Sequence, residues 1–258
     1  MKYIVLVGDG MADYPLEELG QKTPLEAAKT ANMDFIARYG RLGRVKTVPD
    51  NMTPGSDVAI ISILSYDPLK YYTGRGPLEA ANLGIKLKND DVAFRCNLIT
   101  AGEDRLIDYS AGHISSKEAE ILIKHLDSKL GTEKIKFYPG VSYRHLMVVK
   151  DAASLDLQEI ICMPPHDIMG KSISKNLPKG ENAEMLIKLM WDSKPILESH
   201  EINMVRIDLK ENPANMIWLW GQGKNPDMPK FFDKYGLNGS VISAVDLING
   251  LGRILGLE

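Results

Sequence analysis

The 258-residue chain has few cysteines, no excess of basic charge and no long apolar run. Its two cysteines, Cys96 and Cys162, are each alone in their neighbourhood, so there is no CxxC motif and no basis for a disulfide framework. A net charge of −3 provides no general basic field for nucleic acid or lipid headgroups. No apolar stretch approaches the ~20 residues of a membrane span, and the opening apolar run is too short for a secretory signal. We therefore expect a cytoplasmic protein that binds neither nucleic acid nor membranes.

The composition is that of an ordinary globular protein. Hydrophobic residues make up 44% of the chain and charged residues 25%. The length suits one large domain or two modest ones of ~100–200 residues, which can bury a core without disulfides. The three tryptophans are most simply explained as core residues.

The first 64 residues alternate strand and helix patterns. Tyr3–Val7 is a continuous apolar run that ends in a Gly-Asp-Gly turn, which is typical of a central strand in a parallel sheet. Thr23, followed by proline, predicts a helix start, and Gly40 predicts the end of that helix. Arg44–Val48 is a second strand candidate, and another helix is predicted to begin at Ser56. This order predicts an α/β fold with a doubly wound sheet.

Turn-forming residues concentrate between positions 66 and 90, which we interpret as a crossover or hinge. Beyond it, strand-like segments lie at 92–99, 143–149, 217–220 and 239–243, and amphipathic helices lie at 115–130 and 182–198. Clean hairpins are few. We interpret this part as a second α/β domain, at about 85–240, that is inserted into the first, with 241–258 returning to the first domain.

Asp9 is the first candidate for chemistry. It directly follows the predicted central strand, and open α/β sheets bind ligands at the carboxyl ends of their strands. A carboxylate there can hold a divalent cation. The alternative is that Asp9 accepts backbone amides within a turn, and its position alone does not decide between the two.

Ser56 lies in the segment Thr53–Asp57, at a predicted helix start. The unpaired N–H groups and the positive end of the helix dipole favour anions at such a place. A serine hydroxyl there, activated by a metal ion, can attack a phosphoryl group. The alternative is a helix N-cap. The sequence has no GxSxG motif, so an acyl-transfer triad has no support.

The second half of the chain carries isolated cationic and imidazole groups beside turns: Arg95, Arg105, His113, Arg144, His145, His166 with Asp167, and Lys171. Arginine suits bidentate binding of carboxylate or phosphate, and histidine can bind anions or move protons. Two prolines before His166 stiffen the loop that presents it. Any one of these groups, taken alone, is more often part of a surface ion pair than a ligand-binding residue.

Six segments, in order along the chain, resemble motifs of the archaeal-type 2,3-bisphosphoglycerate-independent phosphoglycerate mutases, a family of the alkaline phosphatase superfamily. They are Val7–Asp13, Thr53–Ala59, Tyr71–Pro77, Phe94–Leu98, Pro164–Ile168 and Trp218–Gly223. The resemblance implies an incomplete alkaline-phosphatase-like sheet with an inserted second α/β domain. Residues 1–84 would begin the metal domain, 85–240 would form the inserted transferase-like domain, and 241–258 would return toward the metal domain.

The resemblance also implies an activity, the interconversion of 3-phosphoglycerate and 2-phosphoglycerate through a phosphoserine intermediate, in glycolysis and gluconeogenesis. It implies that Ser56 is the nucleophile, and that Asp9 and Ser56 are ligands of two divalent ions, manganese or magnesium. The substrate-binding residues that it implies are Arg95, Arg144, His145, His166 and Asp167.

The sequence departs from the family pattern in one respect. Family members continue into a C-terminal segment, rich in Asp and His, that carries the remaining metal ligands, whereas no histidine follows His200 here. We therefore expect this chain to be partial, to lack strands of its first sheet and to be inactive alone.

Three alternatives stay open. Another phosphomutase or a phosphohydrolase of the same superfamily would keep Asp9 and Ser56 but change the inserted domain. A non-catalytic protein that binds small phosphorylated metabolites would never phosphorylate Ser56. A nucleotide-binding Rossmann protein has less support, because the GxGxxG fingerprint is absent.

Overall fold

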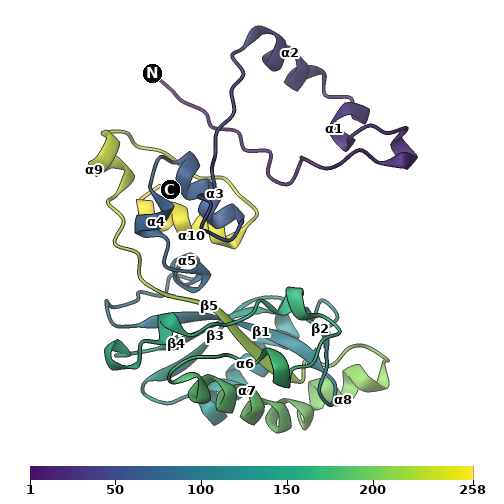
Figure 1. Ribbon diagram of the computed structural model, residues 1–258. Helices are drawn as coiled ribbons and strands as arrows, with labels where there is room; N and C mark the ends of the chain where they lie inside the picture. The colour runs from purple at the N-terminus through teal and green to yellow at the C-terminus, as the bar shows by residue number, and fades with distance from the viewer. Residues whose placement is uncertain (258) are drawn as a thin grey trace. The chain divides into compact units, whose positions relative to one another are not determined.

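The computed structural model describes residues 1–257 and divides into two units, Met1–Pro68 and a second unit that begins at Leu69. The first unit contains the short 3-10 helix η1 (Glu17–Leu19) and the helices α1 (Pro24–Ala27), α2 (Ala31–Tyr39) and α3 (Ser56–Ile63) (Figure 1). The helix α4 (Pro68–Tyr71) spans the point where the second unit begins.

The predicted helix start at Thr23 is confirmed. Thr23 Oγ1 accepts a hydrogen bond from the Glu26 amide at 3.2 Å, and the Glu26 carboxylate accepts one from the Thr23 amide at 2.8 Å, which together form a capping box. Gly40 ends α2 as predicted, by donating to the carbonyl of Ile36. The predicted single helix is divided in two, because Ala28 has extended backbone angles.

The strands predicted at Tyr3–Val7 and Arg44–Val48 are absent, so this prediction is wrong for the described chain. The side chains of Ile4 and Leu6 are 92% and 89% exposed. A central strand requires hydrogen-bonded neighbours and covered faces. Within the described part of the first unit, the only strand-like backbone pairing is an isolated β-bridge between Leu16 and Lys22. The doubly wound, alkaline-phosphatase-like sheet therefore does not form from these residues.

The second unit contains a five-stranded sheet of β1 (Val92–Ala101), β2 (Leu106–Asp108), β3 (Ile135–Val141), β4 (Arg144–Val149) and β5 (Met216–Lys224). Its pairings are antiparallel: β1 lies between β4 and β5, β3 pairs with β4, and β2 pairs with the end of β1. Only two residues join β3 to β4, which form a tight hairpin. The strand predicted at 239–243 is also absent.

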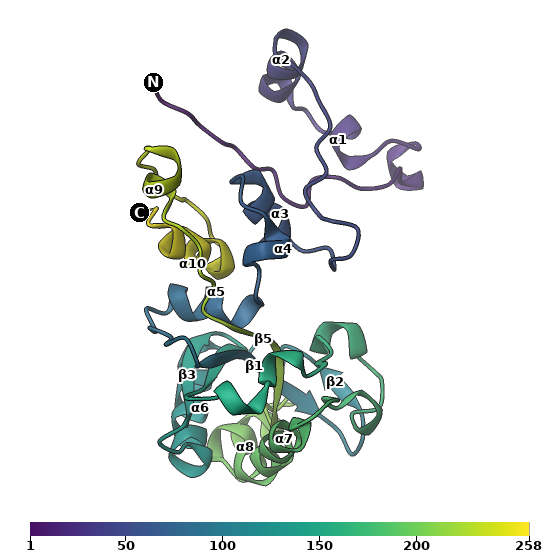
Figure 2. The ribbon, with the colours of Figure 1, turned by 60° about the vertical axis from the view of Figure 1, so that its left-hand side comes forward.

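Helices cover both faces of this sheet. α6 (Ser116–Leu130) and α7 (Ala183–Glu198) pack on one face around a core that includes Phe94 and Cys96, and α5 (Arg75–Asn82) packs on the other (Figures 1 and 2). The remaining helices are α8 (Glu201–Asp208), α9 (Phe231–Tyr235), α10 (Asp246–Leu255) and the 3-10 helices η2 (Ala153–Leu155), η3 (Leu157–Glu159), η4 (Pro165–Ile168) and η5 (Ser174–Asn176). Among residues 1–257 no helix is long and apolar enough to cross a bilayer.

The segment interpreted as a hinge is tightly packed. A Cβ added at Gly76, in α5, would lie 2.2 Å from the carbonyl oxygen of Ala93 in β1, so only glycine permits this approach. α10 packs against α5 in the same way, since a Cβ at Gly250 would lie 1.8 Å from the carbonyl oxygen of Leu78. The segment therefore ties α10 to the sheet through α5. The three-part scheme of 1–84, 85–240 and 241–258 stays a prediction.

Candidate active site

Ser56 and Asp9 lie in contact. Ser56 Oγ donates a hydrogen bond of 2.5 Å to Asp9 Oδ2; the Asp9 residue is exposed and Ser56 is half-buried. The N-cap of α3 is Gly55, so Ser56 occupies the first helical position and its side chain does not cap the helix. The N-cap explanation of Ser56 is therefore wrong, and the Ser56 hydroxyl is instead oriented by a carboxylate.

This pair combines two groups that can take part in phosphoryl transfer, a hydroxyl and a carboxylate. A carboxylate that accepts the hydroxyl's hydrogen bond can orient it and take its proton. The first amides of α3 are placed to bind phosphoryl oxygens. Asp9 is exposed and Ser56 is half-buried, so the pair is not enclosed in a core.

The described residues do not by themselves fit a two-metal centre. The oxygens of Asp9 and Ser56 are hard donors of the kind that magnesium and manganese prefer. Across residues 1–257, however, no group of three or more His, Cys, Asp or Glu side chains is arranged to hold a metal ion. Two oxygen donors are too few to bind two ions tightly, so no chemical step is assigned to a metal ion.

A second group of side chains surrounds Trp220 in β5. The guanidinium carbons of Arg95, from β1, and Arg75, from α5, lie 4.5 and 5.4 Å from the centre of the indole. The ring of His166, from η4, lies 5.4 Å away in an edge-on orientation. Trp220 Nε1 donates to Asn97 Oδ1 at 3.0 Å, which fixes the indole. One buried tryptophan thus brings together two of the predicted substrate-binding residues and one residue that was not predicted.

Glu79, from α5, is an acid in this otherwise cationic group. Its Oε1 lies 3.1 Å from Arg95 Nε, and both side chains are nearly buried. Burial raises the pKa of Glu79, opposed by the charges of Arg95 and Arg144, and burial lowers the pKa of Arg95. The buried Nε of Arg144 has no hydrogen-bond acceptor in the described part of the chain. Arginine suits the bidentate binding of carboxylate or phosphate, so Arg95 and Arg144 are the candidates here for contact with an anionic ligand.

His166 and Asp167 lie on η4, directly after the two prolines. His166 Nε2 is 3.8 Å from Asp167 Oδ1. Burial and the charges of Arg75 and Arg95 lower the pKa of His166, while Asp167 opposes them. The imidazole of the free protein is therefore neutral over a wider pH range than that of an ordinary histidine.

The structure places His145 apart from this group. It is paired with Cys96 in the β1–β4 ladder, whereas Arg144 is paired with Asn97, so His145 faces the side of the sheet opposite to Arg95 and Arg144. Its Nδ1 accepts a hydrogen bond from the Gly140 amide at 3.0 Å, and burial lowers its pKa to about 3. His145 is a buried, neutral hydrogen-bond acceptor that supports the β3–β4 hairpin.

Three members of the Trp220 group, Arg75, Glu79 and Trp220 itself, were missed by sequence reasoning. Trp220 is 4% exposed, as a core residue should be, but its ring also contacts cations. One signal in the sequence could have indicated these residues. Glycines flank Arg75 and follow Trp220, and both places lie in motifs that carry the family resemblance.

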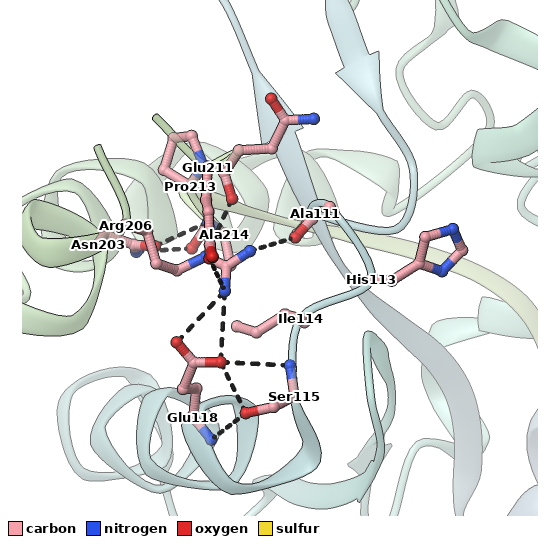
Figure 3. Close-up of polar contacts among 12 residues, drawn as sticks. Ala111, His113, Ile114, Ser115, Glu118, Asn203, Arg206, Glu211, Pro213 and Ala214 are labelled. Carbon is pink, nitrogen blue, oxygen red and sulfur yellow. Dashed lines mark hydrogen bonds and ion pairs between the residues drawn. The ribbon is translucent and has the colours of Figure 1, made fainter. Parts of the chain in front are cut away.

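A turn with left-handed backbone angles lies beside the same group. Ala111, Gly112 and His113 have φ values of 48°, 65° and 52°, which are strained for the two non-glycine residues. The ring of His113 lies 6.2 Å from that of Tyr143, whose ring is 5.6 Å from that of Tyr109. Figure 3 shows the His113 side chain pointing away from the hydrogen bonds that hold the turn.

Arg206, in α8, holds this turn and is only 3% exposed. Its Nη2 donates to the carbonyl of Ala111 at 2.9 Å, and its Nη1 lies 3.3 Å from both carboxylate oxygens of Glu118 (Figure 3). Glu118 in turn accepts from the amide and hydroxyl of Ser115, the N-cap of α6, which confirms the predicted helix start. A cavity of about 480 Å³ beside this network is lined by Gly112, His113, Ser115, Glu118, Arg206, Lys210, Glu211 and Asn212. The network is structural, because its charges pair with one another.

Comparisons with known proteins agree with the motif resemblance. A family model described as 2,3-bisphosphoglycerate-independent phosphoglycerate mutase matches residues 37–203. A protein of that name from Methanosarcina mazei is 56% identical over 258 residues, which cover the whole chain and 64% of the relative. A probable mutase of the same kind from Geobacter sulfurreducens is 52% identical over 262 residues, which cover 65% of that relative. The chain thus spans less than two thirds of the length of these relatives.

Two solved structures are similar. The cofactor-independent phosphoglycerate mutase from Thermoplasma acidophilum is 28% identical with a TM-score of 0.56, over 96% of this chain and 66% of that one. The PH0037 protein from Pyrococcus horikoshii is 28% identical with a TM-score of 0.72, over 97% of this chain and 58% of that one.

Proposed function

The chain belongs to the 2,3-bisphosphoglycerate-independent phosphoglycerate mutase family, and from this premise we propose that it carries the phosphoryl-accepting serine and the substrate-binding group of such a mutase. The proposed reaction interconverts 3-phosphoglycerate and 2-phosphoglycerate, as in glycolysis and gluconeogenesis. The hydrogen bond from Ser56 to Asp9 is the observation that carries the proposal. A cytoplasmic location is also proposed, and the two free cysteines support it.

In the proposed chemistry, Ser56 Oγ attacks the phosphorus of the substrate as its proton passes to Asp9. The bond from phosphorus to the substrate oxygen breaks, that oxygen takes the proton held by Asp9, and phosphoserine and glycerate form. The other glycerate hydroxyl then gives its proton to Asp9 as it attacks the phosphoserine, the bond from phosphorus to Ser56 Oγ breaks, and the proton returns to Ser56 as the isomer forms. The amides at the start of α3 offset charge on the phosphoryl oxygens. Asp9 and Ser56 are further proposed as two of the oxygen ligands of divalent ions, manganese or magnesium, whose other ligands residues 1–257 do not supply.

The group around Trp220 is proposed to hold the glycerate. Arg95 and Arg144 carry the positive charge that an anion requires, and a buried donor of Arg144 has no acceptor in the described chain. His166 and Asp167 lie beside them on a stiff loop. In this proposal residues 85–240 are the inserted substrate domain, and His145 supports that domain from the other face of the sheet.

A chimaera tests the function. The 258 residues replace their counterpart in the Methanosarcina mazei relative, which supplies the remaining 36% or so of its own length. We expect the chimaera to interconvert the two phosphoglycerates and the 258-residue chain alone to show no turnover. A folded chimaera that acts on pentose phosphates or an aryl phosphate, but not on phosphoglycerates, would contradict the proposal in favour of another phosphomutase or a phosphohydrolase.

A further inference from the structure

Two like charges lie against one indole. The guanidinium carbons of Arg75 and Arg95 are both within the ~6 Å of the Trp220 ring at which cations and aromatic rings attract. The charge of Arg75 also contributes to the lowered pKa of Arg95, after the larger effect of burial. The two guanidinium groups therefore repel each other, and the Trp220 ring offsets part of that repulsion.

The sheet fixes Trp220 in this position. In the β1–β5 ladder it lies directly opposite Arg95, and its indole nitrogen is bonded to Asn97. The next residue, Gly221, has a φ of 61°, and a Cβ there would lie 3.4 Å from the Cβ of Arg75 and 3.6 Å from the Cδ of Arg95. Both arginines thus pack within ordinary contact distance of the Gly221 backbone, and the positive φ is what favours glycine at this position.

The backbone around Arg75 is equally fixed. A Cβ at Gly74 would lie 2.0 Å from the carbonyl oxygen of Gln222, and one at Gly76 would lie 2.2 Å from that of Ala93. Thr73 Oγ1 donates to the carbonyl of Lys224 at 2.6 Å. Close backbone contact with two strands therefore places Arg75, so its position beside Arg95 is built into the fold.

We propose that Arg75 is a further substrate-binding residue, which holds the substrate carboxylate together with Arg95, and that Trp220 is the positioning residue that keeps the two guanidinium groups side by side. A carboxylate presents two oxygens to a guanidinium fork, which matches arginine better than lysine. The inference deepens the proposed function and rests on it. It assigns to this pair the preference for phosphorylated hydroxy acids over phosphate esters that lack a carboxylate.

Calorimetric titration of the 258-residue chain tests the role of Arg75. The ligands are 3-phosphoglycerate, D-glycerate, which lacks the phosphoryl group, and glycerol 3-phosphate, which lacks the carboxylate. Arg75→Gln is expected to weaken binding of the first two about 10- to 100-fold, the range of a charge-assisted hydrogen bond, and to leave glycerol 3-phosphate unchanged. Arg75→Lys, which keeps the charge, is expected to lose less than Arg75→Gln and serves if the latter fails to fold.

A double-mutant cycle tests the role of Trp220. Trp220→Phe is expected to weaken D-glycerate binding about tenfold, because a phenyl ring attracts cations less and lacks the bond to Asn97. Adding Trp220→Phe to Arg75→Gln is expected to cause no further loss. Trp191→Phe is the matched control, since Trp191 also lies near a cation, Lys194, at 6.0 Å, but not in this group. Additive losses would overturn the positioning role.

The outcomes separate this inference from the function on which it rests. If the unsubstituted chain binds 3-phosphoglycerate and Arg75→Gln or Arg75→Lys binds D-glycerate equally well, Arg75 is not a substrate-binding residue and the proposed function stands. If Arg75→Gln weakens glycerol 3-phosphate as much as D-glycerate, the assignment to the carboxylate is wrong. If the unsubstituted chain binds neither D-glycerate nor 3-phosphoglycerate, both proposals are overturned.

Discussion

Ser56 donates its hydrogen bond to Asp9, a residue 47 positions earlier in the chain, although the strand predicted to precede Asp9 does not form. The contact joins the two motifs that carry the phosphatase-like part of the family resemblance. It depends on the turn at Gly10, where φ is 73°, and on the first turn of α3. The proposed nucleophile and the carboxylate are therefore paired within the first unit itself.

Asp9→Asn tests the carboxylate. The asparagine oxygen can still accept the hydroxyl of Ser56, but the negative charge is lost. Because Asp9 is exposed, we expect the free energy of unfolding to change by less than ~0.5 kcal/mol, while the affinity for Mn²⁺ falls. A Mn²⁺ titration of the chain measures this, with the exposed Asp13→Asn as the control. Equal affinities in all three proteins would show that Asp9 is not a ligand.

Gly250→Ala separates helix propensity from packing. In an ordinary helix interior this substitution would stabilise the chain by ~1 kcal/mol. Here the new methyl group meets the carbonyl of Leu78 in α5, so we expect a loss of about 1–3 kcal/mol. The urea midpoint reports the change, and Gly43→Ala, which meets no atom within 4 Å, is the control. A raised midpoint for Gly250→Ala would show that α10 does not pack closely on α5.

Glu118→Gln tests the Arg206 network through its pH dependence. Burial alone would raise the pKa of Glu118, but hydrogen bonds from Ser115 and the charge of Arg206 together lower it below its ordinary value of 4.5. The charged form thus stabilises the folded state above that pH, and the contribution is lost as pH falls through the lowered folded-state pKa. We expect the free energy of unfolding of the variant to be about 2 kcal/mol lower at pH 7. This gap between the variant and the unsubstituted chain should close in acid.

Denaturation curves from pH 7 to pH 3 measure that gap. Glu120→Gln on the same helix is the control, because its ion pair with Lys124 is exposed and contributes little. A gap that stays constant across this range would show that the charge of Glu118 does not stabilise the fold.

His166 is expected to report substrate binding. The charges of Arg75 and Arg95, added to burial, lower the pKa of its imidazole. A bound anion offsets these charges, so the pKa should rise on binding and the affinity for D-glycerate should increase as pH falls through it. NMR titration of the imidazole with and without D-glycerate measures the shift. A pKa unchanged at saturating D-glycerate would place the ligand elsewhere.

The sequence predicted those elements whose signals are local. The helix starts at Thr23, Ser56 and Ser115 and the strand over 92–99 are confirmed. Tyr3–Val7 carries an equally strong strand pattern, yet a strand forms only where another pairs with it, and pairing is not encoded in the run itself. The antiparallel order of the sheet was missed for the same reason.

The residues of the candidate site likewise differ in whether a local sequence signal identifies them. Asp9 and Ser56 could be identified because each occupies a position with its own chemical meaning, a turn after an apolar run and a helix start. Arg75 and Trp220 could not, because their meeting depends on the β1–β5 register and on glycines that let the segment from Thr73 to Gly76 approach the sheet. The family resemblance implied that His145 binds substrate together with Arg144, but neighbours in a strand face opposite sides of the sheet.

Mass spectrometry of the peptide that contains Ser56, taken from the chimaera after mixing with 3-phosphoglycerate and Mn²⁺, tests the central claim most directly. We predict that Ser56 carries one phosphoryl group. The control variant Ser62→Ala, changed in the same helix, should also carry this phosphoryl group. Ser56→Ala should lose both the phosphoryl group and the turnover of 3-phosphoglycerate. Turnover of 3-phosphoglycerate that persists in Ser56→Ala would contradict the account.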